Sequence, residues 1–155
     1  MFRVAGLAFA LSLVLAASAR AAGPPSPCKL VTVAEVKAAF GGAVAGGKID
    51  NSLPSGPQCV FHVKHSNLGV DGDAIVFVTP GQSAATFRIA KKTVPGAVGV
   101  GGIGTGAFYD PHTTSIELLK GNTVASAQGV FLGASNAAKA KADVIVLAKA
   151  VAKHL

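Results

Sequence analysis

The side chains best suited to bind a metal ion gather in one short stretch of the chain. His62 and His65 are followed by Asp71 and Asp73, and imidazole with carboxylate is a ligand set that suits zinc or copper. The two histidines are an odd number of positions apart, so on a regular strand they point to opposite faces unless the chain bends at Ser66. The spacing therefore favours solvated histidines near a turn, and we predict no metal site.

A run of glycines formally matches the dinucleotide-binding pattern. Residues 99–104 read Gly-Val-Gly-Gly-Ile-Gly. That pattern binds a pyrophosphate only where a strand precedes it and a helix follows, so that the helix N-terminus receives the phosphate. Here Pro95-Gly96 precedes the run, and residues 105–109 have the composition of a strand. We therefore predict no cofactor site, and interpret residues 95–106 as a loop that could gate a binding surface.

The remaining reactive side chains form no recognisable catalytic set. Gly81-Gln82-Ser83 resembles a nucleophile elbow that lacks its second glycine, and Ser83 is better explained as a helix N-cap. The scattered acids are Glu35, Asp50, Asp71, Asp73, Asp110, Glu117 and Asp143. None of them forms a pair that suggests glycoside chemistry. The sequence therefore predicts no catalytic residue and no enzyme, although a site assembled from distant residues stays open.

Basic residues gather on two segments that have helical periodicity. They are Arg88, Lys91 and Lys92 on the first segment, and Lys139, Lys141, Lys149 and Lys153 on the second. If both helices pack on the same sheet face, they form a positive surface for an anionic envelope component or protein partner. A solvated lysine face is the simpler interpretation.

Nucleic acid is a disfavoured partner for this chain. The net charge is +7, but the chain has no tryptophan and a single tyrosine. Its phenylalanines mostly fit core positions, so no platform for base stacking is visible. The sequence gives no indication of the oligomeric state.

The first residues have the pattern of a cleaved secretory signal. Met1-Phe2-Arg3 is a short positive start, residues 4–17 are almost entirely apolar, and Ala19-x-Ala21 matches a cleavage site. The apolar run is too short to span a bilayer comfortably. We therefore predict that residues 1–21 are a signal peptide and that the product is periplasmic or secreted, with no transmembrane segment. A retained membrane anchor is the alternative.

Export has a consequence for the two cysteines of the chain. An oxidising compartment favours a disulfide between Cys28 and Cys59. Two buried free thiols are the alternative. Residues 22–27 are a Pro-rich lead before Cys28 rather than the apolar and small residues that precede a lipid-attachment cysteine. We expect residues 28–155 to form one domain.

Local patterns place three helices in that domain. Thr32-Val33-Ala34-Glu35 is a capping box that opens a helix ended by Gly41-Gly42. A second helix covers residues 83–92, and a third runs from a cap at Ser135 or Asn136 to His154.

The strand signals lie between the helices. We expect a short strand at 44–50 that is broken by Gly46-Gly47, strands at 58–64, 74–78 and 107–109, and a hairpin of 115–120 with 123–130 around Gly121-Asn122. The continuously apolar segment 74–78 predicts a central strand that is buried on both faces. The fold class is therefore α+β, with a mainly antiparallel sheet and helices packed on it.

Several short segments together carry a family resemblance. They are residues 28–36, Phe40-Gly41, the Cys59-x-Phe61 strand, the glycine-rich residues 100–107 and the terminal alanine/lysine helix. In these the chain resembles small exported bacterial cell-envelope domains of unknown function, often lipoproteins, which are similar to the PsbP-like α/β/α sandwich. The resemblance implies a binding or accessory role rather than catalysis. It supplies no functional residues, and this chain lacks the lipid-attachment cysteine.

Three functions stay open at this point. The first is a non-enzymatic accessory or binding domain of the bacterial envelope that uses the sheet face or the lysine-bearing helices. The second is a small-molecule or lipid-binding domain with a pocket between sheet and helix, gated by residues 95–106. The third is a hydrolase whose histidine, carboxylate and hydroxyl come together only in the fold.

Overall fold

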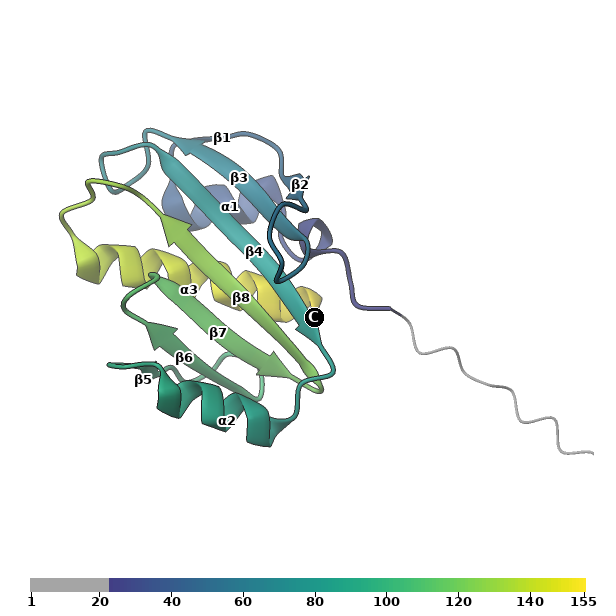
Figure 1. Cartoon of the computed structure of the whole chain (residues 1–155). Coiled ribbons are helices and arrows are strands. Elements are labelled where there is room, and N and C mark those ends of the chain that lie inside the picture. Colours follow the sequence, from purple (N-terminus) through teal and green to yellow (C-terminus); the bar gives the residue numbers. More distant parts are fainter. Residues whose placement is uncertain (1–22) are drawn as a thin grey trace, which may run out of the picture.

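The strands of the chain form one antiparallel sheet in the computed structural model, which describes residues 23–155 (Figure 1). The strands are β1 (Ala43–Val44), β2 (Lys48–Asp50), β3 (Gln58–Lys64), β4 (Gly72–Pro80), β5 (Val98–Gly99), β6 (Gly106–Asp110), β7 (Ser115–Lys120) and β8 (Thr123–Val130). Their order is β1-β3-β4-β8-β7-β6-β5, with β2 also paired to β3. The predicted α+β class and antiparallel sheet are confirmed.

The three predicted helices are present at the expected places. They are α1 (Val33–Phe40), α2 (Ala84–Thr93) and α3 (Ala137–His154), and a 3-10 turn spans Pro27–Lys29. The capping box of α1 is complete, because the Thr32 backbone N–H donates to Glu35 Oε2 at 2.9 Å and the Glu35 N–H donates to Thr32 Oγ1 at 3.2 Å. The Asn136 side chain caps α3 by accepting from the Lys139 N–H at 2.9 Å.

Helices α1 and α3 cover one face of the sheet and build the main core with it (Figure 1). Side chains alternate along each strand, so every second residue points to this face. The strand residues that it buries include Cys59, Phe61, Val63, Ala74, Val76, Ile116, Leu118, Ala125 and Ala127. Val36 and Phe40 of α1 and Val144, Leu147 and Val151 of α3 pack against them.

The opposite face of the sheet is covered only in part. Phe87 of α2 packs there with Phe108 of β6 and Leu119 of β7, in a second and smaller apolar cluster. Ile75 and Phe77 of β4 point to the same face and are only half-buried. The prediction that β4 is buried on both faces is therefore wrong, because α2 lies over the β6–β7–β8 side of the sheet and does not extend across β4.

The Cys28–Cys59 disulfide is present and joins the start of the domain to β3, with the two Cα atoms 5.0 Å apart. Cys59 is fully buried in the main core. Gly47 packs directly on the bridge, and a Cβ at this position would lie 2.6 Å from Cys59 Sγ. The predicted signal peptide lies outside the described residues. None of the helices within residues 23–155 has the length and apolar character needed to cross a membrane.

Replacing Cys59 with Ser is expected to destabilise the fold strongly. The bridge joins residues that are 31 positions apart, and closing a loop of that size contributes about 3 to 4 kcal/mol in the chain-entropy model. Thermal and urea unfolding of the oxidised protein, of Cys28→Ser and of Cys59→Ser measure the effect. An identical melting temperature for the wild type with and without a reducing agent would show that the bridge contributes nothing.

Candidate functional site

Helix α2 is held against the sheet by few contacts. Ser83 caps its N-terminus by accepting a hydrogen bond from the Thr86 N–H at 3.1 Å. Phe87 is the only buried residue of the helix. Its ring packs on that of Phe108, with centroids 5.3 Å apart and a tilt of 47°. This aromatic contact positions α2 over the face of the sheet that α1 and α3 leave free.

Strand register determines which side chains lie beneath α2. Phe108 of β6 is paired with Glu117 of β7, and Glu117 is paired with Ser126 of β8. Cross-strand partners point to the same face. Because Ile116 and Leu118 on either side of Glu117 enter the main core, Glu117 points away from that core and towards α2.

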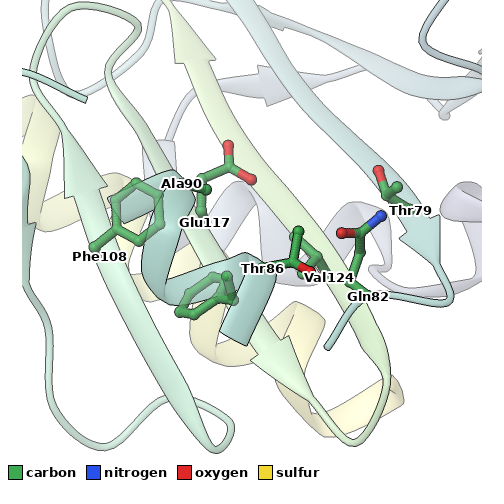
Figure 2. Close-up of a pocket in the computed structure, with 8 residues that line it drawn as sticks. Thr79, Gln82, Thr86, Ala90, Phe108, Glu117 and Val124 are labelled. Carbon is green, nitrogen blue, oxygen red and sulfur yellow. The ribbon is translucent and has the colours of Figure 1, made fainter. Parts of the chain in front are cut away.

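A pocket of about 220 Å³ lies between α2 and the sheet, and Glu117 is the only ionisable residue in its lining. We call it the Glu117 pocket. It is lined by Thr79, Gln82, Thr86, Phe87, Ala90, Phe108, Glu117 and Val124. In Figure 2 the Glu117 carboxyl group lies between the ring of Phe108 on one side and Thr86, Val124 and Gln82 on the other. The pocket therefore combines apolar walls with one acid and a few neutral polar groups.

The environment of Glu117 disfavours its charged form. Burial raises the pKa of this carboxyl group above its ordinary value of 4.5, and the negative charge of Asp110 raises it further. The neighbouring hydroxyls of Ser126 and Ser115 act in the opposite direction. Within the described residues Glu117 forms no salt bridge. Glu117 is thus a half-buried acid that forms no ion pair within residues 23–155.

Ser126 adds a second unsatisfied group beside this acid. In residues 23–155 its Oγ is the one buried side-chain oxygen or nitrogen that has no hydrogen-bond partner of regular geometry. Buried polar groups normally have partners, and an exception calls for an explanation. Here the hydroxyl lies directly across the β7–β8 ladder from Glu117, so the register places a carboxyl group beside it as a possible acceptor.

The lining of the pocket suits binding better than acyl or glycosyl transfer. It offers one carboxyl group, two threonine hydroxyls and the Gln82 amide, but no histidine. A hydroxyl nucleophile needs an adjacent base that is itself oriented by a third group. The lining holds no histidine that could act as such a base. It also holds no second carboxyl group to pair with Glu117 for glycoside chemistry.

The histidines predicted to be solvated lie far from α2 in the sheet. His62 Nδ1 is 3.0 Å from Asp73 Oδ1, and His65 Nδ1 is 3.9 Å from Asp71 Oδ1. These are two separate and exposed pairs at the β3–β4 end of the sheet. Among the described residues no group of three or more histidine, cysteine or acidic side chains could hold a metal ion.

The glycine run connects α2 with β6, as its flanking sequence indicates. The segment between α2 and β6 contains the short strand β5, which ends at Gly99, and the buried Ile103. Gly104 has a φ of 56°, and a Cβ here would collide with the Leu119 carbonyl. No residue of 95–106 lines the Glu117 pocket. Thr105 and Gly106 instead border a hollow on the other side of α2, so the loop does not gate the Glu117 pocket in this conformation.

The two sets of basic residues do not form one surface, because α2 and α3 pack on opposite faces of the sheet. On α3, Lys139 Nζ is 3.0 Å from Asp143 Oδ1 and Lys141 Nζ lies 5.0 Å above the ring of Tyr109. Lys149 and Lys153 border a shallow hollow beside Gly102.

The basic residues of α2 have fewer partners. Arg88, Lys91 and Lys92 are exposed and form no salt bridge in the described part of the chain. Arg88 and Lys91 border the hollow of about 320 Å³ that includes Thr105. The anionic-partner surface predicted from sequence is therefore reduced to two separate groups of cations.

Comparison with known proteins gives no assignment. No protein-family model, curated protein or solved structure matches the chain. The resemblance to PsbP-like envelope domains therefore stays a prediction.

Sequence reasoning missed Glu117 as a site residue and counted it among the scattered acids. A signal was nevertheless present. Ser115, Glu117 and Leu119 alternate with the apolar Ile116 and Leu118, which places an acid at the centre of a strand face. What the alternation does not show is that a helix covers this face.

Glu117→Gln is expected to stabilise the fold at neutral pH and to lose this advantage in acid. Because the folded-state pKa is raised above 4.5, wild-type stability falls as pH rises from about 4.5 through the folded pKa. Glutamine does not titrate, so the free-energy gap in favour of the variant should widen over that window. Urea unfolding of both proteins from pH 4 to 8 measures the gap. A gap that is constant with pH, or that favours the wild type increasingly at high pH, would contradict the assignment.

Proposed function

We propose that this chain is a non-enzymatic binding domain that acts outside the cytoplasm and holds a small ligand in the Glu117 pocket. The observation that carries the proposal is the pocket itself, which lies between one sheet face and α2 and combines apolar walls with an enclosed acid. Ligand sites in proteins are typically concave and largely apolar, with a few polar groups that orient the ligand.

The compartment is supported by the disulfide. Structural disulfides form and persist in oxidising environments and are rare in the cytosol. The Cys28–Cys59 bridge covalently joins the start of the domain to β3. This agrees with the secretory pattern of residues 1–21, and a periplasmic or secreted location is part of the proposal.

Binding rather than catalysis is supported by what lines the pocket. The polar groups around Glu117 are hydroxyls and an amide, which can orient a ligand by hydrogen bonds but do not form an acid–base pair. A larger hollow of about 520 Å³ lies beside the Pro-rich lead. It contains no ionisable side chain, so it offers less for specific recognition.

A second candidate function rests on the outer side of α2. Arg88, Lys91 and Lys92 carry no acidic partner within residues 23–155, and Ile89 among them is 62% exposed. A basic helix face with an exposed aliphatic residue suits an anionic envelope component or an acidic protein. This role does not compete with a ligand under the helix.

The pocket is expected to bind a neutral aromatic fragment in a saturable way, and filling it should abolish binding. Benzyl alcohol is a suitable probe because its ring matches the Phe87 and Phe108 walls and its hydroxyl can reach polar groups. Titration followed by amide NMR should shift signals of Thr79, Thr86 and Val124. Ala90→Leu, which extends a lining residue into the pocket, should weaken binding at least tenfold.

Ala85→Leu is the matched control, because Ala85 lies on the outer side of α2 beside Arg88 and Ile89. This variant should bind the fragment as the wild type does. Fragment-induced shifts that do not saturate, or that are equally strong in Ala90→Leu, would refute the pocket as a ligand site.

A further inference from the structure

Two acids share the sheet face beneath and beside α2. Asp110 of β6 is paired with Ser115, and Phe108 is paired with Glu117, so Asp110 and Glu117 lie diagonally across the β6–β7 ladder. Diagonal neighbours in an antiparallel pair are roughly 7–8 Å apart. The Asp110 Oδ1 is held in place by accepting a hydrogen bond from the His112 N–H at 2.8 Å. A fixed negative charge therefore lies near the Glu117 carboxyl group.

No basic side chain of the described chain forms a salt bridge with either acid. Helix α2 contributes Thr86, Phe87 and Ala90 to the pocket. Its Arg88 and Lys91 border the hollow on its other side. The lining of the pocket thus carries one acid and no basic side chain, and Lys91 Nζ lies instead over Gly99 of the neighbouring strand β5.

The walls of the pocket also favour a cation with an apolar body. The rings of Phe87 and Phe108 are tilted by 47°, and aromatic faces attract ammonium groups. Val124 and Ala90 complete the apolar lining, while Thr79, Gln82 and Thr86 offer hydrogen-bond partners. The volume of about 220 Å³ is below the range of about 300–1,000 Å³ that holds drug-sized ligands, so the ligand is small.

From these observations we infer that the ligand of the Glu117 pocket is a small amine, whose ammonium group pairs with Glu117 while its apolar body lies against Phe87, Phe108 and Val124. The inference deepens the proposed function and rests on it. A neutral ligand would leave the enclosed carboxylate without compensation, which is costly. An anionic ligand would be repelled by both acids.

The charge preference can be measured with three fragments that share one ring and one length. Benzylamine, benzyl alcohol and benzoate are titrated into the protein at pH 7.5 and followed by amide NMR. Benzylamine is expected to bind at least tenfold more tightly than benzyl alcohol, and benzoate more weakly than either. In Glu117→Gln the preference for the amine over the alcohol should disappear.

Two further measurements test whether the preference for the amine comes from Glu117 rather than from any acid on this sheet face. Asp73→Asn removes an acid from the same sheet face outside the pocket, and it should keep the preference. In the wild type, benzylamine affinity should fall on acidification as Glu117 takes up a proton, while benzyl alcohol affinity should not fall. This pH series tests the inference even if Glu117→Gln does not fold.

The outcomes distinguish the inference from the function on which it rests. Equal or tighter binding of the alcohol or of benzoate at the same residues would overturn the amine while leaving a ligand pocket. Loss of the preference in Asp73→Asn would also overturn it, because Glu117 would then not be the determinant. Binding of none of the three fragments to the pocket would refute the proposed function together with the inference.

Discussion

The contact between Phe87 and Phe108 is the interaction on which the second half of the structure depends. The sheet has two faces with apolar residues, and α1 and α3 together satisfy one of them. On the other face the only buried side chain that α2 contributes is Phe87. Because α2 contacts the sheet mainly through the ring of Phe87, space remains between the sheet and the helix on either side of this contact. The Glu117 pocket on one side and the Arg88–Lys91 hollow on the other follow from this arrangement.

The position of Glu117 is a consequence of register rather than of local preference. The β7–β8 hairpin turns at Gly121-Asn122, and Gly121 adopts the positive φ of 60° that such a turn requires. The turn sets the pairing of Glu117 with Ser126. A slip of one residue would place the carboxyl group in the main core between α3 and the sheet. The same register that keeps the acid out of the main core therefore places it beneath α2 on the other face.

Local signals in the sequence were sufficient for most of the elements. The capping box at Thr32 and Glu35, the caps at Ser83 and Asn136, and the Gly121-Asn122 turn each act within a few residues, and all are present in the structure. The predicted disulfide is confirmed as well. Two cysteines allow only one intramolecular pairing. These features need no knowledge of which strand lies beside which.

The sequence does not predict which distant strands pair with each other. β4 lies beside β8 although α2 and three strands separate them along the chain, and alternation specifies a face but not a partner. For that reason the apolar run of β4 was expected to be buried on both faces, and the sides on which α2 and α3 pack could not be assigned. Glu117 was overlooked on the same ground, since its enclosure comes from α2, which is distant in sequence.

The ionisation of Glu117 beneath α2 is the property on which the proposed ligand site depends most directly. An NMR titration of its side-chain carboxyl carbon, in the wild type and in Phe87→Ala, measures this property. The expectation is a pKa above 4.5 in the wild type and a return towards that ordinary value in Phe87→Ala, because the helix then no longer covers the acid. A wild-type pKa at or below 4.5, or a raised value that is unchanged in Phe87→Ala, would contradict it.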